Sequence, residues 1–161
     1  MKIYVDQEKL RQPDVVQFEL EEWIDSSPFE TLLGVRVEQA VDGHAVLTMP
    51  FTVKLANGGG VMHGGAMTTL ADTAVAMAIK SLVSPGTIFA TTGLSVEFIA
   101  PVLAGQVTAR ARARGPEGRI FHGECELRGE HDELYARLTS VFKVARNEQG
   151  NLLYTEHPTG G

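Results

Sequence analysis

One long apolar segment restricts the fold of this chain more than any other feature. It runs from Asn57 to Leu82, opens with a glycine-rich loop that passes through His63-Gly64-Gly65, and then contains one acid, Asp72, and one base, Lys80. A helix that is apolar on all sides belongs in a protein interior rather than at a surface. A buried polar group without a partner costs roughly 1–3 kcal/mol. Asp72 therefore requires either a structural partner or a chemical role.

Segments with strand periodicity flank this predicted helix. Residues 35–41 alternate between apolar and polar side chains, and Asp42-Gly43 turns the chain into a second strand that ends near Pro50. Four further strands are predicted after the helix, at 87–99, 107–114, 120–128 and 134–145, with a turn at 115–118. An antiparallel sheet whose apolar face packs on the helix satisfies every segment. The sequence therefore predicts an α+β fold in which a curved six-stranded sheet wraps one long central helix.

Two short helices are expected before the sheet. An amphipathic helix is predicted over 14–25, where apolar residues that include Trp23 share one stripe. Ser27-Pro28-Phe29-Glu30 has the pattern of a capping box with proline in the first helical position, and Gly34 ends this second helix. We divide the chain into an N-terminal helical extension (1–26), a main domain (27–146) and a polar C-terminal tail (147–161).

Length, charge and cysteine content narrow the functional classes. A chain of 161 residues fits one domain with its own core, and a net charge of −6 argues against general affinity for nucleic acid. The single cysteine, Cys125, excludes an internal disulfide or a cysteine-cluster metal site. The first residues lack an apolar run and the stretch 66–79 is too short to span a bilayer, so we expect no secretory signal and a cytoplasmic protein. We also expect no metal, because the histidine spacing matches no ligand pattern.

A set of motifs around the central helix resembles a known family. Asn57 stands six residues before His63-Gly64-Gly65, Asp72 follows His63 by nine residues, and Glu97-Phe98-Ile99-Ala100-Pro101 ends a predicted strand. With the order of the elements, these motifs resemble the hotdog-fold acyl-CoA thioesterases of the phenylacetate-degradation type over roughly residues 29–144. The resemblance implies the hotdog fold, an acyl-CoA substrate, and hydrolysis to a carboxylic acid and free coenzyme A without a metal or organic cofactor.

The start of the predicted helix can stabilise negative charge. The first backbone N–H groups of a helix have no internal partner, and the helix dipole favours an anion there. The resemblance implies that the N–H of Gly64 polarises the thioester carbonyl, and glycines at 64 and 65 let the substrate approach closely. The alternative is that Gly64 and Gly65 only allow a tight entry into the helix.

The resemblance makes Asp72 the general base toward water or the nucleophile on the thioester carbonyl. The structural alternative is an aspartate held by a backbone amide or by an arginine of another strand. Gly64 and Asp72 are eight residues apart, hence about 12 Å along one helix. Because this is too far for both to act on one thioester within a single copy, we expect the N–H and the carboxylate to come from two copies related by a two-fold axis. The resemblance implies such homodimers, which commonly pair into homotetramers.

Three further residues complete the predicted site. The resemblance implies that the Asn57 amide orients the attacking water or the thioester, and that a hydroxyl from Thr91, or from Thr92 if the alignment shifts by one, lies near the carboxylate. We expect His63 to position the loop by hydrogen bonding rather than to act as the base. The alternatives are an Asn57 that only forms a glycine turn and a His63 that only caps the helix.

The phosphates of coenzyme A require local cations in an acidic protein. Arg110, Arg112 and Arg114 alternate with small apolar residues, project from one face of a predicted strand, and are candidates for this role. A charged solvent face is the alternative. Two other functions also stay open at this point: a hotdog-fold enoyl- or hydroxyacyl-CoA hydratase or dehydratase, and a non-catalytic acyl-CoA-binding module.

Overall fold

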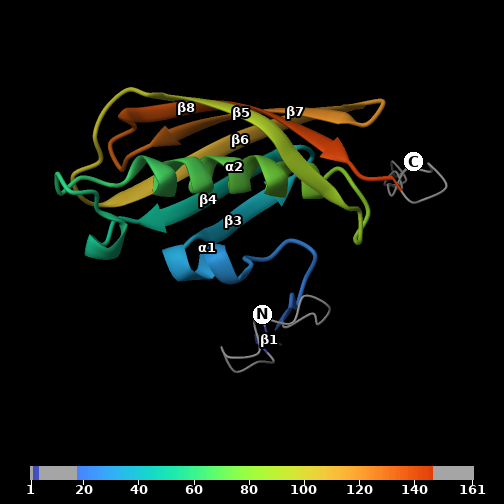
Figure 1. The fold of residues 1–161 in the computed structure, drawn as a ribbon, viewed down its shortest axis with the longest axis horizontal. Coiled ribbons are helices and arrows are strands. Elements are labelled where there is room, and N and C mark those ends of the chain that lie inside the picture. Colours follow the sequence, from blue (N-terminus) through green and yellow to red (C-terminus); the bar gives the residue numbers. More distant parts are fainter. Residues whose placement is uncertain (1, 4–17, 147–161) are drawn as a thin grey trace.

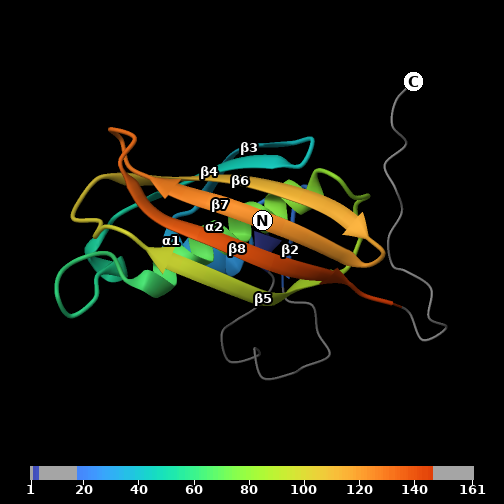
Figure 2. The ribbon, with the colours of Figure 1, turned by 90° about the horizontal axis from the view of Figure 1, so that it is seen from above.

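A curved antiparallel sheet wraps around one long helix, α2 (Gly64–Lys80), as Figures 1 and 2 show. This computed structural model describes residues 2–3 and 18–146 of the 161-residue chain. The strands of the sheet are β3 (Arg36–Val41), β4 (His44–Pro50), β5 (Phe89–Phe98), β6 (Gln106–Glu117), β7 (Ile120–Arg128) and β8 (Leu134–Val144). They lie in the order β3-β4-β6-β7-β8-β5. The predicted α+β architecture and its six antiparallel strands are confirmed.

Small side chains on the concave face of the sheet let α2 lie close to it. On β6, Ala109, Ala111 and Ala113 are buried, whereas the arginines that alternate with them are exposed. On β7, Gly123 stands where an added Cβ would overlap the side chain of Val75 in the helix. Protein interiors are packed nearly as densely as organic crystals, so the shape of the sheet fixes where each residue of α2 points.

Of the two turns predicted at 42–43 and 115–118, the first is confirmed and the second is displaced along the chain. Asp42 and Gly43 both have positive φ, 49° and 75°, as a two-residue hairpin turn requires. The turn expected at 115–118 starts later, because β6 runs on to Glu117, which pairs with Ile120. A shift in register between Arg114 and Glu117 accommodates the intervening glycine and proline as a bulge rather than as a turn.

The second predicted helix is confirmed as α1 (Pro28–Leu33), and the left-handed Gly34 ends it with φ of 79°. The capping box is wrong in its side-chain contacts. Ser27 makes no side-chain cap, and the Glu30 carboxylate instead accepts a hydrogen bond of 3.4 Å from the hydroxyl of Thr73 in α2. A short 3-10 helix, η2 (Val53–Leu55), leads into the glycine-rich loop.

The amphipathic helix predicted over 14–25 is wrong in the part that the structure describes. Phe18 and Glu19 form β2 (Phe18–Glu19), which pairs with β1 (Lys2–Ile3), and residues 21–24 form bends; residues 14–17 lie outside the described residues. Trp23 bonds to the end of α2 through its indole and its carbonyl. Such tertiary contacts override a helical pattern in the local sequence. The boundaries at 26 and 146 stay predictions.

We expect Gly123→Ala to lower the free energy of unfolding by about 1–3 kcal/mol, because the new methyl group overpacks the contact with Val75. Urea denaturation followed by circular dichroism measures this change. Gly58→Ala is the matched control, since a Cβ at Gly58 meets nothing within 4 Å. Equal stability of the two variants would contradict the close packing of α2 on β7.

Candidate active site

Asp72 lies on the face of α2 that is turned toward the start of β5, and Thr91 is its hydrogen-bond partner. The Thr91 Oγ1 is 3.1 Å from Asp72 Oδ1 and 3.0 Å from Oδ2, so one hydroxyl hydrogen is shared by the two carboxylate oxygens. Thr92 is the extra residue of a β-bulge and donates instead to the carbonyl of Val141. Of the two threonines considered from the sequence, Thr91 is therefore the one beside the carboxylate.

The carboxyl of Asp72 is partly buried, and its environment changes its acidity. Burial disfavours the charged form and raises the pKa of Asp72 above its ordinary value of 3.8, while the hydrogen bond from Thr91 acts in the opposite direction. Neither a backbone amide nor an arginine holds the carboxylate among the described residues. A carboxylate with one neutral donor and a raised pKa retains the basicity that a general base needs.

A cavity of about 460 Å³ opens beside Asp72. Its walls come from four parts of the chain: the C-terminal half of α2, residues 87–91 at the start of β5, residues 23–30 around α1, and Phe142 of β8. Both polar and apolar side chains line it, with Thr91 near Asp72 and Phe89 and Phe142 among the apolar ones. A cavity of this size is within the range of small-molecule sites.

The start of α2 forms a separate polar site. His63 is the N-cap, and its Nδ1 accepts a hydrogen bond of 2.8 Å from the Gly65 N–H, which leaves the ring proton on Nε2. The Gly64 N–H has no acceptor among the described residues. The ring of Phe98, at the end of β5, lies 3.1 Å from where a Cβ of Gly64 would stand. Gly64 thus offers a free N–H in a confined place.

Asn57 organises the loop that precedes this helix start. Its Oδ1 accepts hydrogen bonds from the N–H groups of Gly59 and Val61 at 2.8 and 3.4 Å, and its own N–H donates to the Val61 carbonyl. These contacts match the turn-forming alternative for Asn57 and hold the glycine-rich loop in one shape. The catalytic role expected for the Asn57 side chain stays a prediction.

Within one copy, the structure divides the predicted residues between two places. Asp72 and Thr91 stand beside the cavity, whereas Asn57, His63 and Gly64 gather at the start of the same helix. Eight residues of α2 separate Asp72 from Gly64, hence about 12 Å along the helix axis. Within one copy the predicted residues therefore form two separate groups, which we call half-sites.

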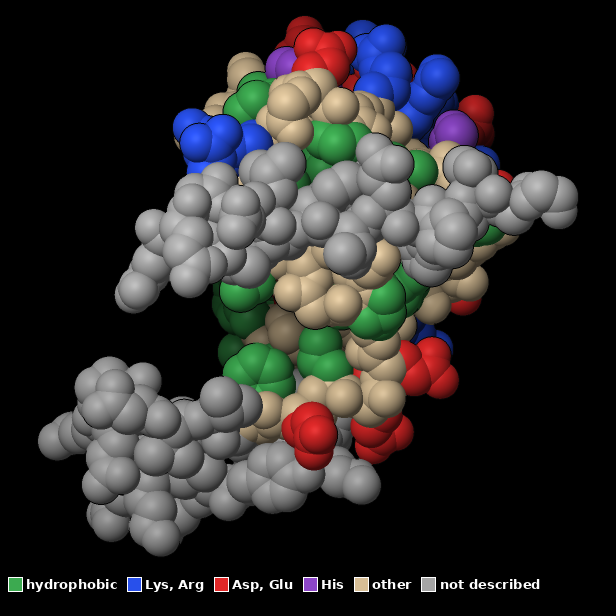
Figure 3. All heavy atoms as spheres, turned by 90° about the vertical axis from the view of Figure 1, so that its right-hand side faces the viewer, with side chains coloured by type: hydrophobic (Ala, Val, Ile, Leu, Met, Phe, Trp, Pro, Cys, Tyr) green, Lys and Arg blue, Asp and Glu red, His purple; other side chains and the backbone are tan. Residues whose placement is uncertain are grey.

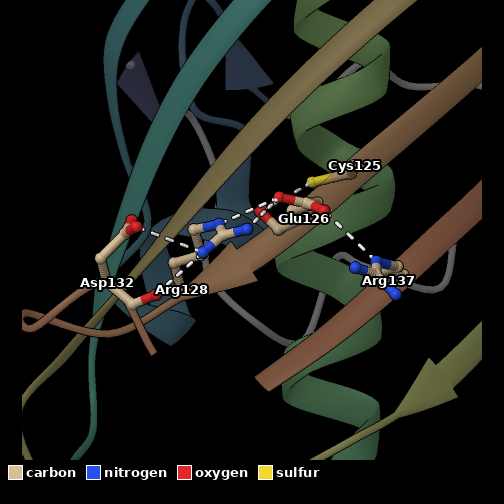
Figure 4. A network of polar contacts seen from close by, with 5 residues as sticks. All are labelled: Cys125, Glu126, Arg128, Asp132 and Arg137. Carbon is tan, nitrogen blue, oxygen red and sulfur yellow. Dashed lines mark hydrogen bonds and ion pairs between the residues drawn. The ribbon is translucent and has the colours of Figure 1, made fainter. Parts of the chain in front are cut away.

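The arginines considered for coenzyme A lie on the convex face of the sheet, away from α2. Arg110, Arg112 and Arg114 are exposed, and none of them lines the cavity beside Asp72. Basic and acidic side chains mix over the sheet at the top of Figure 3. On the same face, Glu126 accepts hydrogen bonds from Arg128 and Arg137 (Figure 4), and the Arg128 contact lowers the pKa of Glu126. Binding of phosphates by the three arginines stays a prediction.

Trp23, Glu30 and Lys80 line the cavity, although none of them was predicted as a site residue. From the sequence, Glu30 was expected to cap a helix and Trp23 to pack as part of one, and no role was predicted for Lys80. Glu30 Oε2 is buried without a hydrogen-bond partner among the described residues. Lys80 could have been found from its spacing, because it follows Asp72 by eight residues and so lies on the same helix face. Nothing in the sequence pattern places Trp23 or Glu30 there.

The described residues also bear on metal binding and on membrane spanning. No group of three or more histidine, cysteine or acidic side chains is arranged there to hold a metal ion. None of the helices in the same part of the chain combines the length and the hydropathy needed to cross a membrane.

We expect Asp72→Asn to stabilise the fold at neutral pH. Because the folded-state pKa of Asp72 is raised, its contribution to stability is fully present below about 3.8 and is lost as the pH rises through the folded-state value. The increase in the free energy of unfolding caused by the substitution should be largest near neutral pH and smaller toward acid pH. Urea denaturation at a series of pH values measures it. Glu97→Gln, on the exposed part of β5, controls for the loss of a carboxylate charge. A gain that is the same at every pH would contradict this account.

Comparisons with known proteins agree with the geometry of the fold. A family model described as the thioesterase superfamily matches residues 59–136, which include the start of α2, Asp72 and Thr91. The acyl-coenzyme A thioesterase PaaI of Escherichia coli is 33% identical over 92 residues, which cover 55% of this chain and 64% of that protein. The chain thus spans slightly less than two thirds of the length of this curated relative.

Solved structures share the same architecture. The conserved protein PA5202 of Pseudomonas aeruginosa is 30% identical and superposes with a TM-score of 0.71, covering 79% of this chain and 100% of that chain. The PaaI protein from the phenylacetic acid degradation operon of Escherichia coli is 25% identical and has a TM-score of 0.67, over 74% of this chain and 85% of that one. Residues 59–136 therefore match the thioesterase superfamily, and the chain is similar to PaaI-like thioesterases and has the hotdog fold.

Proposed function

We propose that this protein is an acyl-CoA thioesterase that hydrolyses a thioester to a carboxylic acid and free coenzyme A. The observation that carries the proposal is the Asp72 carboxylate, held by one hydroxyl at the edge of a cavity on an otherwise apolar helix. The free N–H of Gly64 adds the second element that ester and thioester hydrolysis needs. One relative, PaaI of Escherichia coli, is named as an acyl-coenzyme A thioesterase, which supports the proposal.

In the proposed reaction, the Gly64 N–H donates to the thioester oxygen and stabilises the negative charge that develops on it. Asp72 takes a proton from a water molecule, whose oxygen bonds to the carbonyl carbon. The tetrahedral intermediate collapses, the carbon–sulfur bond breaks, and the proton held by Asp72 passes to the leaving thiolate. In the alternative route, Asp72 itself bonds to the carbonyl carbon, expels the thiolate as a mixed anhydride forms, and water then hydrolyses the anhydride.

The proposed site requires a second copy of the chain, and β5 is the strand that suits this contact. Among the described strands it has one neighbour, β8, and its residues Leu94 and Phe98 are 45% and 53% exposed. A long edge strand with exposed apolar residues favours pairing with another strand. Thr91 lies beside Asp72, and Phe98 lies beside Gly64, so β5 links the two half-sites of one copy.

The register of such a pair follows from the positions of the half-sites. Two β5 strands that pair about a two-fold axis must run antiparallel, so positions on opposite sides of the axis face one another. If the axis passes between Leu94 and Ser95, Thr91 of one copy faces Phe98 of the second copy. Asp72 of the first copy then lies next to Gly64 of the second, and the reverse also holds. The dimer therefore has two complete sites, each built from one half-site of each copy. Further association into a homotetramer and a cytoplasmic location also belong to the proposal.

Gly64→Pro tests the N–H directly. Proline is tolerated at the first helical position, and the preceding His63, with φ of −64° and ψ of 133°, has a conformation that a following proline permits. Gly64→Ala is the matched control, because it adds the same Cβ near Phe98 and keeps the N–H. We expect kcat of the proline variant to fall about 10²–10³-fold below that of the alanine variant. Equal kcat values would refute the role of the N–H.

Mixing two inactive variants tests the shared site. Asp72→Asn lacks the carboxylate and Gly64→Pro lacks the N–H, so each homodimer has two defective sites. After co-refolding at equal concentrations, half the dimers are mixed and each has one intact site, which should restore about a quarter of wild-type activity. Thiol release from acyl-CoA measures it. Mixtures that stay as inactive as the separate variants would exclude a site shared between copies.

The hydratase and binding-module alternatives differ from hydrolysis in their products. A hydratase would use a histidine as well as an acid, but His63 Nδ1 is occupied by the Gly65 N–H. A binding module would bind acyl-CoA without releasing thiol. Thiol release that depends on Asp72, with no change at the carbon–carbon double bond of an enoyl-CoA, distinguishes the thioesterase from both.

A further inference from the structure

Trp23 and Lys80 form a reciprocal contact at the end of α2, which we call the Trp23–Lys80 clasp. The indole Nε1 of Trp23 donates a hydrogen bond of 3.0 Å to the Lys80 carbonyl, and the Lys80 Nζ donates one of 2.9 Å to the Trp23 carbonyl. The same ammonium lies 4.8 Å from the centroid of the Trp23 ring, within the range of a cation–π contact. Three interactions therefore hold the N-terminal segment against the last turn of the helix.

The clasp has a defined place in the cavity beside Asp72. Asp72, Ala76 and Lys80 follow one another at intervals of four residues on one face of α2, and all three line the cavity. Asp72 and Lys80 are separated by eight residues, hence by about 12 Å along the helix. Trp23 also lines the cavity and is bonded to Lys80. The clasp thus stands at the opposite end of the helix face from the carboxylate.

The space between the two ends suits a hydrocarbon group. Ala76, Met77, Phe89 and Phe142 contribute apolar surface between Asp72 and the clasp. The rings of Phe89 and Phe142 pack edge to face in that wall, with centroids 6.0 Å apart. If the thioester carbonyl lies at Asp72, as the proposed function requires, the acyl chain runs along this wall toward Trp23.

We propose that the Trp23–Lys80 clasp limits the length of the acyl group that this protein accepts, and that Trp23 is a specificity-determining residue. This inference rests on the proposed function. With C–C bonds of about 1.5 Å, an extended chain advances roughly 1.3 Å per carbon, so about 12 Å of helix accommodates roughly nine carbons. The substrates are therefore short- and medium-chain acyl groups or a compact ring of similar length, rather than long fatty acyl groups.

The polar groups around the Trp23–Lys80 clasp stabilise its contacts. Burial lowers the pKa of Lys80, but the nearby carboxylates of Glu30 and Asp25 act in the opposite direction and favour the ammonium form. The Lys80 carbonyl is one of the last in α2, where carbonyl groups lack partners within the helix, and the Trp23 indole satisfies it. An acyl chain that displaced Trp23 would break both hydrogen bonds and uncover a charged group next to hydrocarbon.

The test is the chain-length profile of kcat/KM, measured with saturated acyl-CoAs from acetyl to palmitoyl. We expect the wild-type value to fall at least about tenfold between octanoyl and palmitoyl. Trp23→Ala should shift this fall to longer chains and raise the ratio of palmitoyl to octanoyl hydrolysis by a similar factor. Phe18→Ala, which removes an aromatic residue of the same segment that does not line the cavity, should retain the wild-type profile.

Binding measurements separate this inference from the proposed function. Dissociation constants of hydrolysis-resistant thioether analogues of the same chain lengths, measured by calorimetry, do not depend on catalysis. If the wild type releases no thiol but the analogues show a length limit that shifts in Trp23→Ala, the proposed function fails and the inference stands. The inference is wrong if thiol is released but Trp23→Ala changes kcat/KM by the same factor at every chain length. It is also wrong if the wild type shows no length limit.

A second variant covers the case in which Trp23→Ala does not fold. Lys80→Met removes the ammonium, and with it one hydrogen bond and the cation–π contact, but keeps an unbranched apolar side chain of similar reach. We expect it to shift the length limit in the same direction as Trp23→Ala. An unchanged limit in folded Lys80→Met, confirmed by circular dichroism, would overturn the role of the clasp.

Discussion

The close approach of α2 to the concave face of the sheet is the constraint on which the rest of the structure depends. It is possible because alanines on β6 and Gly123 on β7 leave room for the helix. A helix enclosed in this way has few positions that are not fully buried, and the partly buried Asp72 occupies one of them, where α2 faces β5. The same enclosure fixes the direction of the helix, so its free N–H end and its carboxylate point to different places on the surface.

Most of the fold could be predicted from the sequence because its signals are local. Apolar and polar side chains that alternate with a period of two predicted the six strands, and one apolar run predicted the buried helix. In each case the pattern of side chains indicates which face is buried. The pairing of Thr91 with Asp72 was expected only through the family resemblance. The separation of Gly64 from Asp72 within one copy followed from helix geometry alone, because their distance is set by their separation in the chain.

The parts that could not be predicted depend on contacts between distant segments. The stripe that includes Trp23 has the spacing of an amphipathic helix, but the residue is held by Lys80, 57 positions later. Ser27 and Glu30 have the residue types of a capping box, but Glu30 contacts Thr73 instead. In both cases a local pattern competed with a tertiary partner that the sequence does not reveal. These segments also bring Trp23 and Glu30 to the cavity, so the contacts of these two residues could not be predicted from local patterns.

The bulge at Thr91-Thr92 has a consequence for how β5 tolerates insertions and deletions. Thr91 is opposite Phe142 and Gly93 is opposite Val141, so Thr92 is the one residue without a partner of its own on β8. Because the two residues are identical, deleting either one yields the same polypeptide, in which a single threonine can still stand opposite Phe142 and every later residue of β5 can keep its neighbour. Loss of one of the two threonines would therefore remove the bulge and the hydroxyl that bonds to the Val141 carbonyl, but not the hydroxyl that contacts the carboxylate.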